Sequence, residues 1–276
     1  MISDAVAGGA VLNTENLNLT NNYIFVDVNR STLTADPTLD AIIIKAGNNI
    51  RFINNTLEME DYATAVGMPN YLYGLDVYNI KNMTIESNNF SIKTQGGVYK
   101  AGTAYPIQLT GPLSNVTIDD NDIYSRSNGP NLGIYSTNYG GETALKIVNN
   151  RINVMGLAGE DPWALVVGIE VQDDNDYIVN NTIAVSSIAP VDENDNLFGI
   201  SYRQKLDGEH TFVIKDNLIF SNSTIGVYLY DSVGSTIIDN TVVSSKEGIA
   251  DTSYNGYVEG PGPHSGDTYY NNKILS

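Results

Sequence analysis

Three short runs of acidic and amide residues hold the side chains of this sequence best suited to bind a metal ion. They are 119–122, 173–176 and 192–196. Carboxylate and amide oxygens are hard ligands that suit calcium. The third run begins like a calcium-binding loop, but Leu197 stands where glycine is expected and Arg203 where a closing glutamate is expected. Acidic solubilising turns are the alternative interpretation. The residues that would bind calcium are Asp173, Asp174 and Asp176, or Asp192, Asn194 and Asn196.

Cysteine and histidine, which serve as nucleophiles, general bases and zinc ligands in many enzymes, are absent or scarce. The chain has no cysteine, which excludes a thiolate zinc site, a cysteine nucleophile and a disulfide framework. Its two histidines, His210 and His264, lie in segments that we interpret as loop insertions. We therefore expect no catalytic residue, no enzyme activity and no cofactor other than calcium.

A repeat that runs along the whole chain must position these side chains. Nine times, an apolar residue is followed three positions later by asparagine and, two positions after that, by a second apolar residue. The residue before each of these asparagines is Asn, Asp or Ser, which all favour turns. The spacing varies from 23 residues (217 to 240) to 36 residues (181 to 217), as in a solenoid whose loops differ in length. The asparagines are Asn22, Asn55, Asn88, Asn121, Asn150, Asn181, Asn217, Asn240 and Asn272.

A second motif lies upstream of most of these asparagines. It is a small residue followed by alternating apolar residues, as at 74–77, 168–171 and 226–229. Alternation with period two in segments this short indicates strands. Each repeat therefore predicts three short strands: one after the small residue, one before the asparagine and one after it.

Stacking of these repeats predicts an all-β, single-domain parallel β-helix of about nine coils. The domain covers 1–276, its coils begin at about residue 17, and loop insertions lie near 58–73, 186–197 and 250–267. The chain bends between the second and third strands of each coil, where a residue can adopt the left-handed conformation. An inward asparagine at this bend can hydrogen-bond the asparagine of the next coil, so we expect a stack of nine amides.

Two carboxylates are predicted to point outward from the first strand. Asp76 and Glu170 would lie three coils apart, which is about 14 Å at the usual strand spacing. A glycosidase acid–base pair needs a separation of roughly 5–9.5 Å. We therefore exclude them as such a pair and interpret them as solvated surface carboxylates.

Tyrosines are also predicted on the outer side of the first strand. Aromatic planes mixed with hydrogen-bonding groups suit sugar rings or a protein partner. The alternative is that tyrosine is simply a good residue for a half-exposed strand. The candidate ligand-binding residues are Tyr78, Tyr135, Glu170, Arg203, Tyr228 and Tyr230.

The asparagine-bearing repeat, from about Leu17 to Ile274, resembles the right-handed parallel β-helix repeats of the pectate-lyase-like superfamily. The resemblance implies a right-handed coil, in agreement with the handedness of parallel crossovers. Polygalacturonases of that superfamily carry Gly-His-Gly and Arg-Ile-Lys signatures, which do not occur here. No catalytic residue can therefore be carried over. The acidic, asparagine-rich composition is most similar to the adhesin-like surface proteins of methanogenic archaea.

The charge of the chain limits its partners. Asp and Glu number 32 against 14 Lys and Arg, for a net charge of −18. Such a field repels phosphates, so we expect no binding to nucleic acid or anionic lipid. The sequence holds no apolar run of about 20 residues, so we expect no membrane span.

These features predict a non-catalytic structural and adhesive protein at the cell surface or outside the cell. It would be a rigid rod or fibre subunit whose partner is a glycan or a protein surface, and it would form a homo-oligomer or head-to-tail filament. A polysaccharide lyase or glycoside hydrolase of the same fold is one alternative. A phage tailspike-like protein is another.

Overall fold

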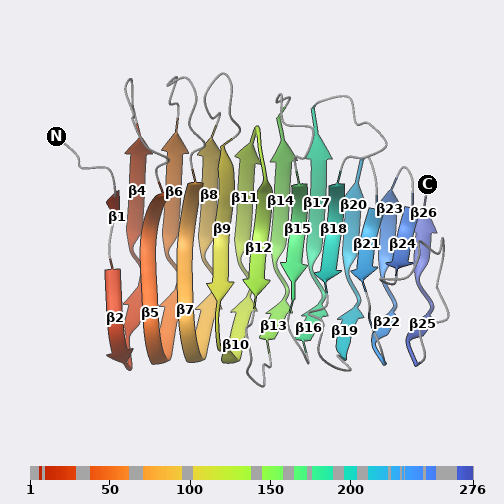
Figure 1. The fold of residues 1–276 in the computed structure, drawn as a ribbon, viewed down its shortest axis with the longest axis horizontal. Helices are drawn as coiled ribbons and strands as arrows, with labels where there is room; N and C mark the ends of the chain where they lie inside the picture. The colour runs from red at the N-terminus through yellow and green to blue at the C-terminus, as the bar shows by residue number, and fades with distance from the viewer. Residues whose placement is uncertain are drawn as a thin grey trace.

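The computed structural model describes residues 6–7, 10–28, 38–61, 71–94, 102–137, 145–157, 165–172, 176–188, 196–203, 211–222, 225–230, 232, 234–244, 247–252 and 266–275. These residues form 26 strands and no helix, so the expected all-β class is confirmed. Accordingly, no helix among them could span a membrane. The strands belong to two parallel sheets that wind together as a β-solenoid (Figure 1).

Sheet A holds the first and second strands of each coil, and sheet B holds the third strands. Sheet A contains β1 (Val6–Ala7), β2 (Ala10–Glu15), β3 (Asn18–Thr20), β5 (Thr38–Ile53), β7 (Tyr71–Glu86), β9 (Thr103–Thr110), β10 (Ser114–Asp119), β12 (Asn131–Thr137), β13 (Leu145–Val148), β15 (Leu165–Val171), β16 (Asp176–Val179), β18 (Asn196–Arg203), β19 (Phe212–Lys215), β21 (Ile225–Tyr230), β22 (Thr236–Ile238), β24 (Glu247–Thr252) and β25 (Thr268–Tyr270). Sheet B contains β4 (Tyr23–Val28), β6 (Thr56–Asp61), β8 (Asn89–Thr94), β11 (Asp122–Ser127), β14 (Arg151–Gly156), β17 (Thr182–Ser187), β20 (Leu218–Ser221), β23 (Thr241–Ser244) and β26 (Lys273–Leu275).

Each strand pairs in parallel with its equivalent in the neighbouring coil. In sheet B, Ile123 of β11 lies between Phe90 of β8 and Ile152 of β14. In sheet A, Ile118 of β10 lies between Ile85 and Ile147 in the same way. The apolar residues that flank each repeat asparagine therefore form continuous columns along the solenoid.

The expected form of the coils is only partly correct. From Thr103 to Leu275 the described residues form about six turns, each with three separate strands (β9 to β26). Before them, β5 and β7 are each 16 residues long, and each runs through the positions expected for a first and a second strand. Nine coils of three short strands are therefore not supported. The long strands bend without a break because Ala46 and Asn79, with φ of 55°, turn the chain inside them.

The core lies between the two sheets. Inward side chains such as Phe52, Ile85 and Ile123 are fully buried, while their sequence neighbours face outward. The alternation of the burial pattern in β8, β11 and β14 matches the period-two pattern of the sequence. Burial of these apolar columns is the main source of stability.

The small residue at the start of the repeat is required by close packing. A Cβ on Gly168 would lie 2.4 Å from Ile183 Cγ2 and 2.6 Å from the carbonyl oxygen of Gly199. A Cβ on Gly199 would lie 2.3 Å from Ile219 Cγ2. Glycine therefore allows sheet A to approach the isoleucines of sheet B.

Parts of the predicted insertions belong to strands. Residues 58–61 and 71–73 belong to β6 and β7, residues 186–187 to β17, and residues 250–252 to β24. The central parts of the insertions, 62–70, 189–195 and 253–265, lie outside the described residues.

Candidate functional site

The nine repeat asparagines form one column, which we call the inner column. Asn121 shows the pattern: its backbone N–H and its Nδ2 both donate to Asn150 Oδ1, at 3.0 and 2.9 Å. Its Nδ2 also donates to the carbonyl oxygen of Ile85 at 3.0 Å. Side-chain bonds of 2.8–3.1 Å link each member to the next, from Asn22 to Asn272. The inner members are buried, so the column holds the fold together and offers no ligand site.

The left-handed residue of each bend is the one before the inner asparagine. These nine residues have φ between 53° and 60°, and all are Asn, Asp or Ser. They also bond across coils on the surface, as where Asn180 Nδ2 donates to Asn149 Oδ1 at 2.7 Å. The sequence shows two polar residues in succession at each bend because they have different roles. The first turns the chain, and the second is the asparagine that fills the interior.

Aromatic rings stack along the outer side of the first strands, which we call the first-strand face. Tyr73 and Tyr105 lie 5.3 Å apart between ring centroids with an interplanar angle of 7°, and Tyr135 continues the row at 5.6 Å. Further along, Phe198 stacks on Tyr228 at 4.7 Å. The tyrosines are half-buried, so their rings pack together and still reach the surface.

The structure brings some of the predicted binding residues together. Tyr135 lies beside Glu170 in register. Tyr230 lies beside Arg203, whose side chain is outside the described part of the structure. Tyr78 lies apart from these residues, beside Lys45 and Thr110.

The prediction that Asp76 and Glu170 are solvated was wrong. Each is only 3% exposed. Asp76 belongs to β7 and Glu170 to β15, and the strands β9 and β12 lie between them, so they are not an acid–base pair. Glu170 Oε1 accepts a hydrogen bond of 3.1 Å from Gln172 Nε2. The sequence pattern correctly places both on the outer side of the strand, but it does not reveal that these two carboxyl groups are buried there.

Asp40 joins Asp76 in a buried carboxyl pair that sequence reasoning missed. Asp40 is 8% exposed and hydrogen-bonds with Asp76, and the Tyr78 hydroxyl donates to Asp76. Lys45 Nζ lies 5.1 Å from the centroid of the Tyr78 ring. Asp40 is paired with Tyr73 and Asp76 with Ile43, so the two acids meet diagonally across neighbouring strands.

Burial controls the protonation of this pair. It raises the pKa of Asp76 to about 7, an effect that the neighbouring Asp40 reinforces and the hydrogen bond from Tyr78 opposes. Burial also raises the pKa of Asp40, against the hydrogen bond with Asp76. Two adjacent carboxyl groups in a buried site cannot both ionise easily. The pair therefore holds a proton near neutral pH and can act as a hydrogen-bond donor.

The calcium prediction falls mostly outside the described residues. Asp173, Asp174, Asp192 and Asn194 are not described, nor is the side chain of Asn196. Asp176 is fully buried at the start of β16, and its Oδ1 accepts a hydrogen bond from the backbone N–H of Leu145 at 3.3 Å. Among the described residues, no group of three or more His, Asp or Glu side chains could hold a metal ion.

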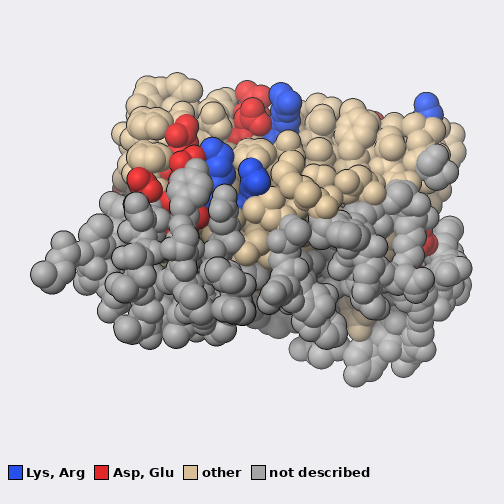
Figure 2. All heavy atoms as spheres, turned by 90° about the horizontal axis from the view of Figure 1, so that it is seen from above, with Lys and Arg blue, Asp and Glu red and all other residues tan. Residues whose placement is uncertain are grey.

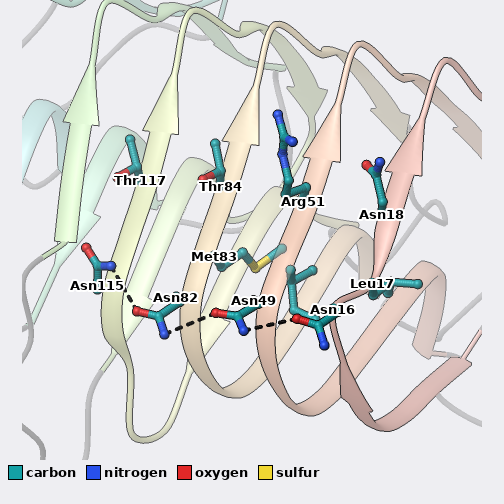
Figure 3. A pocket seen from close by; sticks show the side chains of 11 residues that line it. Asn16, Leu17, Asn18, Asn49, Arg51, Asn82, Met83, Thr84, Asn115 and Thr117 are labelled. Carbon is teal, nitrogen blue, oxygen red and sulfur yellow. Dashed lines mark hydrogen bonds between the residues drawn. The ribbon is translucent and has the colours of Figure 1, made fainter.

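An open groove runs across four coils where the first and second strands meet (Figure 3). We call it the asparagine groove, and its volume is about 390 Å³. One wall is a second asparagine column, in which Nδ2 of Asn49, Asn82 and Asn115 donates to the preceding member at 3.1, 3.3 and 2.9 Å. Asn16 begins this column. Its spacing of 33 residues matches that of the inner column and was a signal that the sequence analysis did not use.

Comparison with known proteins gives likeness of architecture alone. No protein-family model and no curated protein matches the sequence. The periplasmic alginate epimerase AlgG is 12% identical over 98% of this chain and 71% of its own, with a TM-score of 0.41. The Dettilon tailspike protein is 14% identical over 96% and 54%, with a TM-score of 0.39. The Streptococcus pneumoniae surface protein and adhesin PfbA is 11% identical over 96% of this chain and 85% of its own, with a TM-score of 0.30.

Proposed function

We propose that this protein is a non-catalytic, adhesive surface rod whose first-strand face contacts a glycan or a protein. The row of Tyr73, Tyr105 and Tyr135 carries the proposal, because it sets aromatic planes along the solenoid axis at 5.3 and 5.6 Å. Aromatic rings with a polar edge suit surfaces that are apolar in one part and wet in another. Gln108, which is half-buried, lies on the same side beside Tyr135 and supplies hydrogen-bonding groups.

The two asparagine columns support a rigid, structural role. A rod whose coils are linked by buried amides presents side chains at a fixed spacing. Such presentation reduces the entropy lost when a partner binds. The acidic, asparagine-rich composition supports an extracellular or cell-surface location like that of archaeal adhesin-like proteins.

Substitution in the tyrosine row tests the proposal. We expect Tyr105→Ala to weaken binding to a panel of immobilised glycans and cell-surface proteins by about tenfold, since it removes the ring between two stacked neighbours. Tyr124→Ala is the matched control, because Tyr124 is a half-buried outward tyrosine of sheet B. Equal binding by the two variants, or no binding by the unmodified protein, would refute the proposal.

The rods would assemble as homo-oligomers or as head-to-tail filaments. Electron microscopy of the purified protein distinguishes these forms from isolated rods. Isolated rods at all concentrations would contradict self-assembly and leave the contact face to be tested separately.

The buried carboxyl pair favours a second candidate, a polysaccharide lyase or hydrolase. Asp76 is poised to hold a proton near pH 7 beside Tyr78, which suits acid–base chemistry. Incubation with a panel of polyuronates would then release unsaturated or reducing ends, and Asp76→Asn would abolish the release. Absence of turnover would contradict this candidate.

A further inference from the structure

We propose that the asparagine groove is a separate carbohydrate-binding site that takes an extended, neutral oligosaccharide. It lies at the corner between the first and second strands and does not include the tyrosine row. Binding here would therefore be independent of the function proposed above.

The first wall of the groove is a column of amides with unused hydrogen-bonding capacity. Asn16, Asn49 and Asn115 are exposed, and Asn82 is half-buried. Each carboxamide has two N–H donors and an oxygen with two lone pairs. The bonds along the column use one donor of Asn49 and one of Asn115, and Asn82 Nδ2 donates to both Asn48 and Asn49. The remaining groups can bond to a ligand.

All four asparagines of this column are in the left-handed conformation, with φ between 53° and 58°. Asparagine tolerates this conformation better than most residues. The same backbone geometry in these four coils points the amides in the same direction, as Figure 3 shows for the labelled side chains. The donors and acceptors therefore repeat at the coil spacing.

The second wall is a row of outward side chains in register. Asn18, Arg51, Thr84 and Thr117 lie side by side on β3, β5, β7 and β10. Arg51 is exposed and makes no ion pair with any described residue. Its five N–H donors lie next to threonine hydroxyls that both donate and accept. Three strand steps give the row a length of about 14 Å.

The chemistry of the walls selects a ligand rich in hydroxyl groups. A sugar chain offers both donors and acceptors along its length, which matches amides and hydroxyls on two sides. The chain must be extended because the column and the row are straight and parallel to the solenoid axis. It must be neutral because the net charge of −18 repels polyanions. A positively charged ligand is disfavoured as well, because the guanidinium of Arg51 would repel it.

The test follows the side-chain amide signals of the ¹⁵N-labelled full chain by NMR. Cellotetraose, an extended chain, and maltotetraose, a curved one, are each added up to about 10 mM, which would saturate a site with a Kd of about 1 mM. We expect cellotetraose to shift the signals of Asn49, Asn82 and Asn115, and maltotetraose to leave them in place. Absence of shifts with both sugars, or equal shifts with both, would overturn the proposal.

Matched variants separate this site from other binding. We expect Arg51→Ala to weaken cellotetraose binding by about tenfold, as for the loss of a charge-assisted hydrogen bond. Arg151→Ala is the control, since Arg151 is an exposed arginine of sheet B, and it should bind as the unmodified protein does. Tyr105→Ala should also leave the groove shifts unchanged. Loss of the shifts in Tyr105→Ala, or an unchanged Kd in Arg51→Ala, would refute a site in the groove.

Discussion

Each buried asparagine of the inner column hydrogen-bonds both with backbone groups and with the side chains of neighbouring asparagines. Asn121 accepts from the backbone N–H and the Nδ2 of Asn88, and it donates to Asn150 and to Ile85. A buried polar group that loses its partner costs about 1–3 kcal/mol. Since each member completes the bonding of the next, the column is a set of linked buried bonds rather than a row of separate ones.

Substitution inside the column should therefore be costly. We expect Asn121→Ala to lower the free energy of unfolding by about 3 kcal/mol, because it leaves donors of Asn88 without a partner. Urea unfolding monitored by circular dichroism measures the change. Asn89→Ala, at an exposed position one residue beyond the column, is the control and should cost less than about 0.5 kcal/mol. A similar effect of the two substitutions would contradict this role.

Ala46 is in the left-handed conformation without a side chain that favours it. Its φ is 55°, and Asn79 and Gly111 occupy the equivalent turn in the next coils with φ of 55° and 85°. We expect Ala46→Asn to stabilise the protein by about 0.5–1 kcal/mol. Thermal unfolding should show a higher midpoint. Ala184→Asn, on a half-buried strand position, should be neutral or destabilising, and a gain there equal to that at Ala46 would contradict the conformational explanation.

The carboxyl pair makes stability depend on pH. The pKa of Asp76 is raised from its ordinary value of 3.8 to about 7, so between these values the folded state holds a proton that the unfolded state has released. Its contribution to stability is present below about pH 4 and is lost as the pH rises to about 7. We expect the unmodified protein to lose about 1–3 kcal/mol of stability relative to Asp76→Asn as the pH rises over this range, because asparagine does not titrate. Parallel pH profiles for the two proteins would contradict the raised pKa.

At the scale of the strands, the spacing between the sheets depends on glycine. Gly133, Gly168, Gly199 and Gly226 lie at one register position, and a Cβ on any of them would meet the carbonyl oxygen of the next coil at 2.5–2.7 Å. Backbone atoms of a parallel sheet cannot move aside without breaking its hydrogen bonds. The position therefore excludes larger residues in the central coils.

Insertion of a methyl group at this position should be strongly destabilising. We expect Gly199→Ala to cost about 3 kcal/mol, because its Cβ would overlap Ile219 from the opposite sheet. Gly47→Ala is the control: there the Cβ would be 3.1 Å from the flexible ends of Ile50 and Ile80, and we expect less than about 1 kcal/mol. Denaturant midpoints of both variants measure the difference, and equal values would contradict it.

At the scale of the whole molecule, like charge opposes the compact state. In the view of Figure 2, most of the charged side chains in sight lie over the N-terminal half and the middle of the described surface. Lys93 and Glu60 form an ion pair of 2.8 Å between neighbouring strands. Ion pairs of this kind offset little of the repulsion that follows from a net charge of −18, with 32 acidic and 14 basic residues.

Salt should therefore stabilise the molecule. Raising the ionic strength to about 0.1 M shortens the screening length to about 10 Å and weakens repulsion between acids on different coils. We expect the unfolding midpoint to rise by a few degrees when salt is added to a low-salt buffer at pH 8, where the carboxylates are ionised. A constant or falling midpoint would show that self-repulsion does not limit stability.

The amino-acid sequence alone determined the β class, the parallel stacking and the inner column. These follow from local rules, because each coil repeats the same turn residue, inward asparagine and apolar flanks, as at Asp120, Asn121 and Ile123. A column of amides also makes the coils keep one register. The left-handed residue was identifiable only as one of the two polar residues of the bend, and the geometry shows that it is the first.

Only the tertiary structure decided which side chains of different coils meet and which of them are buried. Asp40 and Asp76 meet because the parallel pairing of β5 with β7 brings together two residues that are 36 positions apart in the sequence, and their burial is a property of the folded chain. The asparagine groove needs four strands in register before its two walls face each other. Such features arise from distances between segments far apart in the chain, and a repeat pattern specifies the repeating unit without specifying the surface that the units build together.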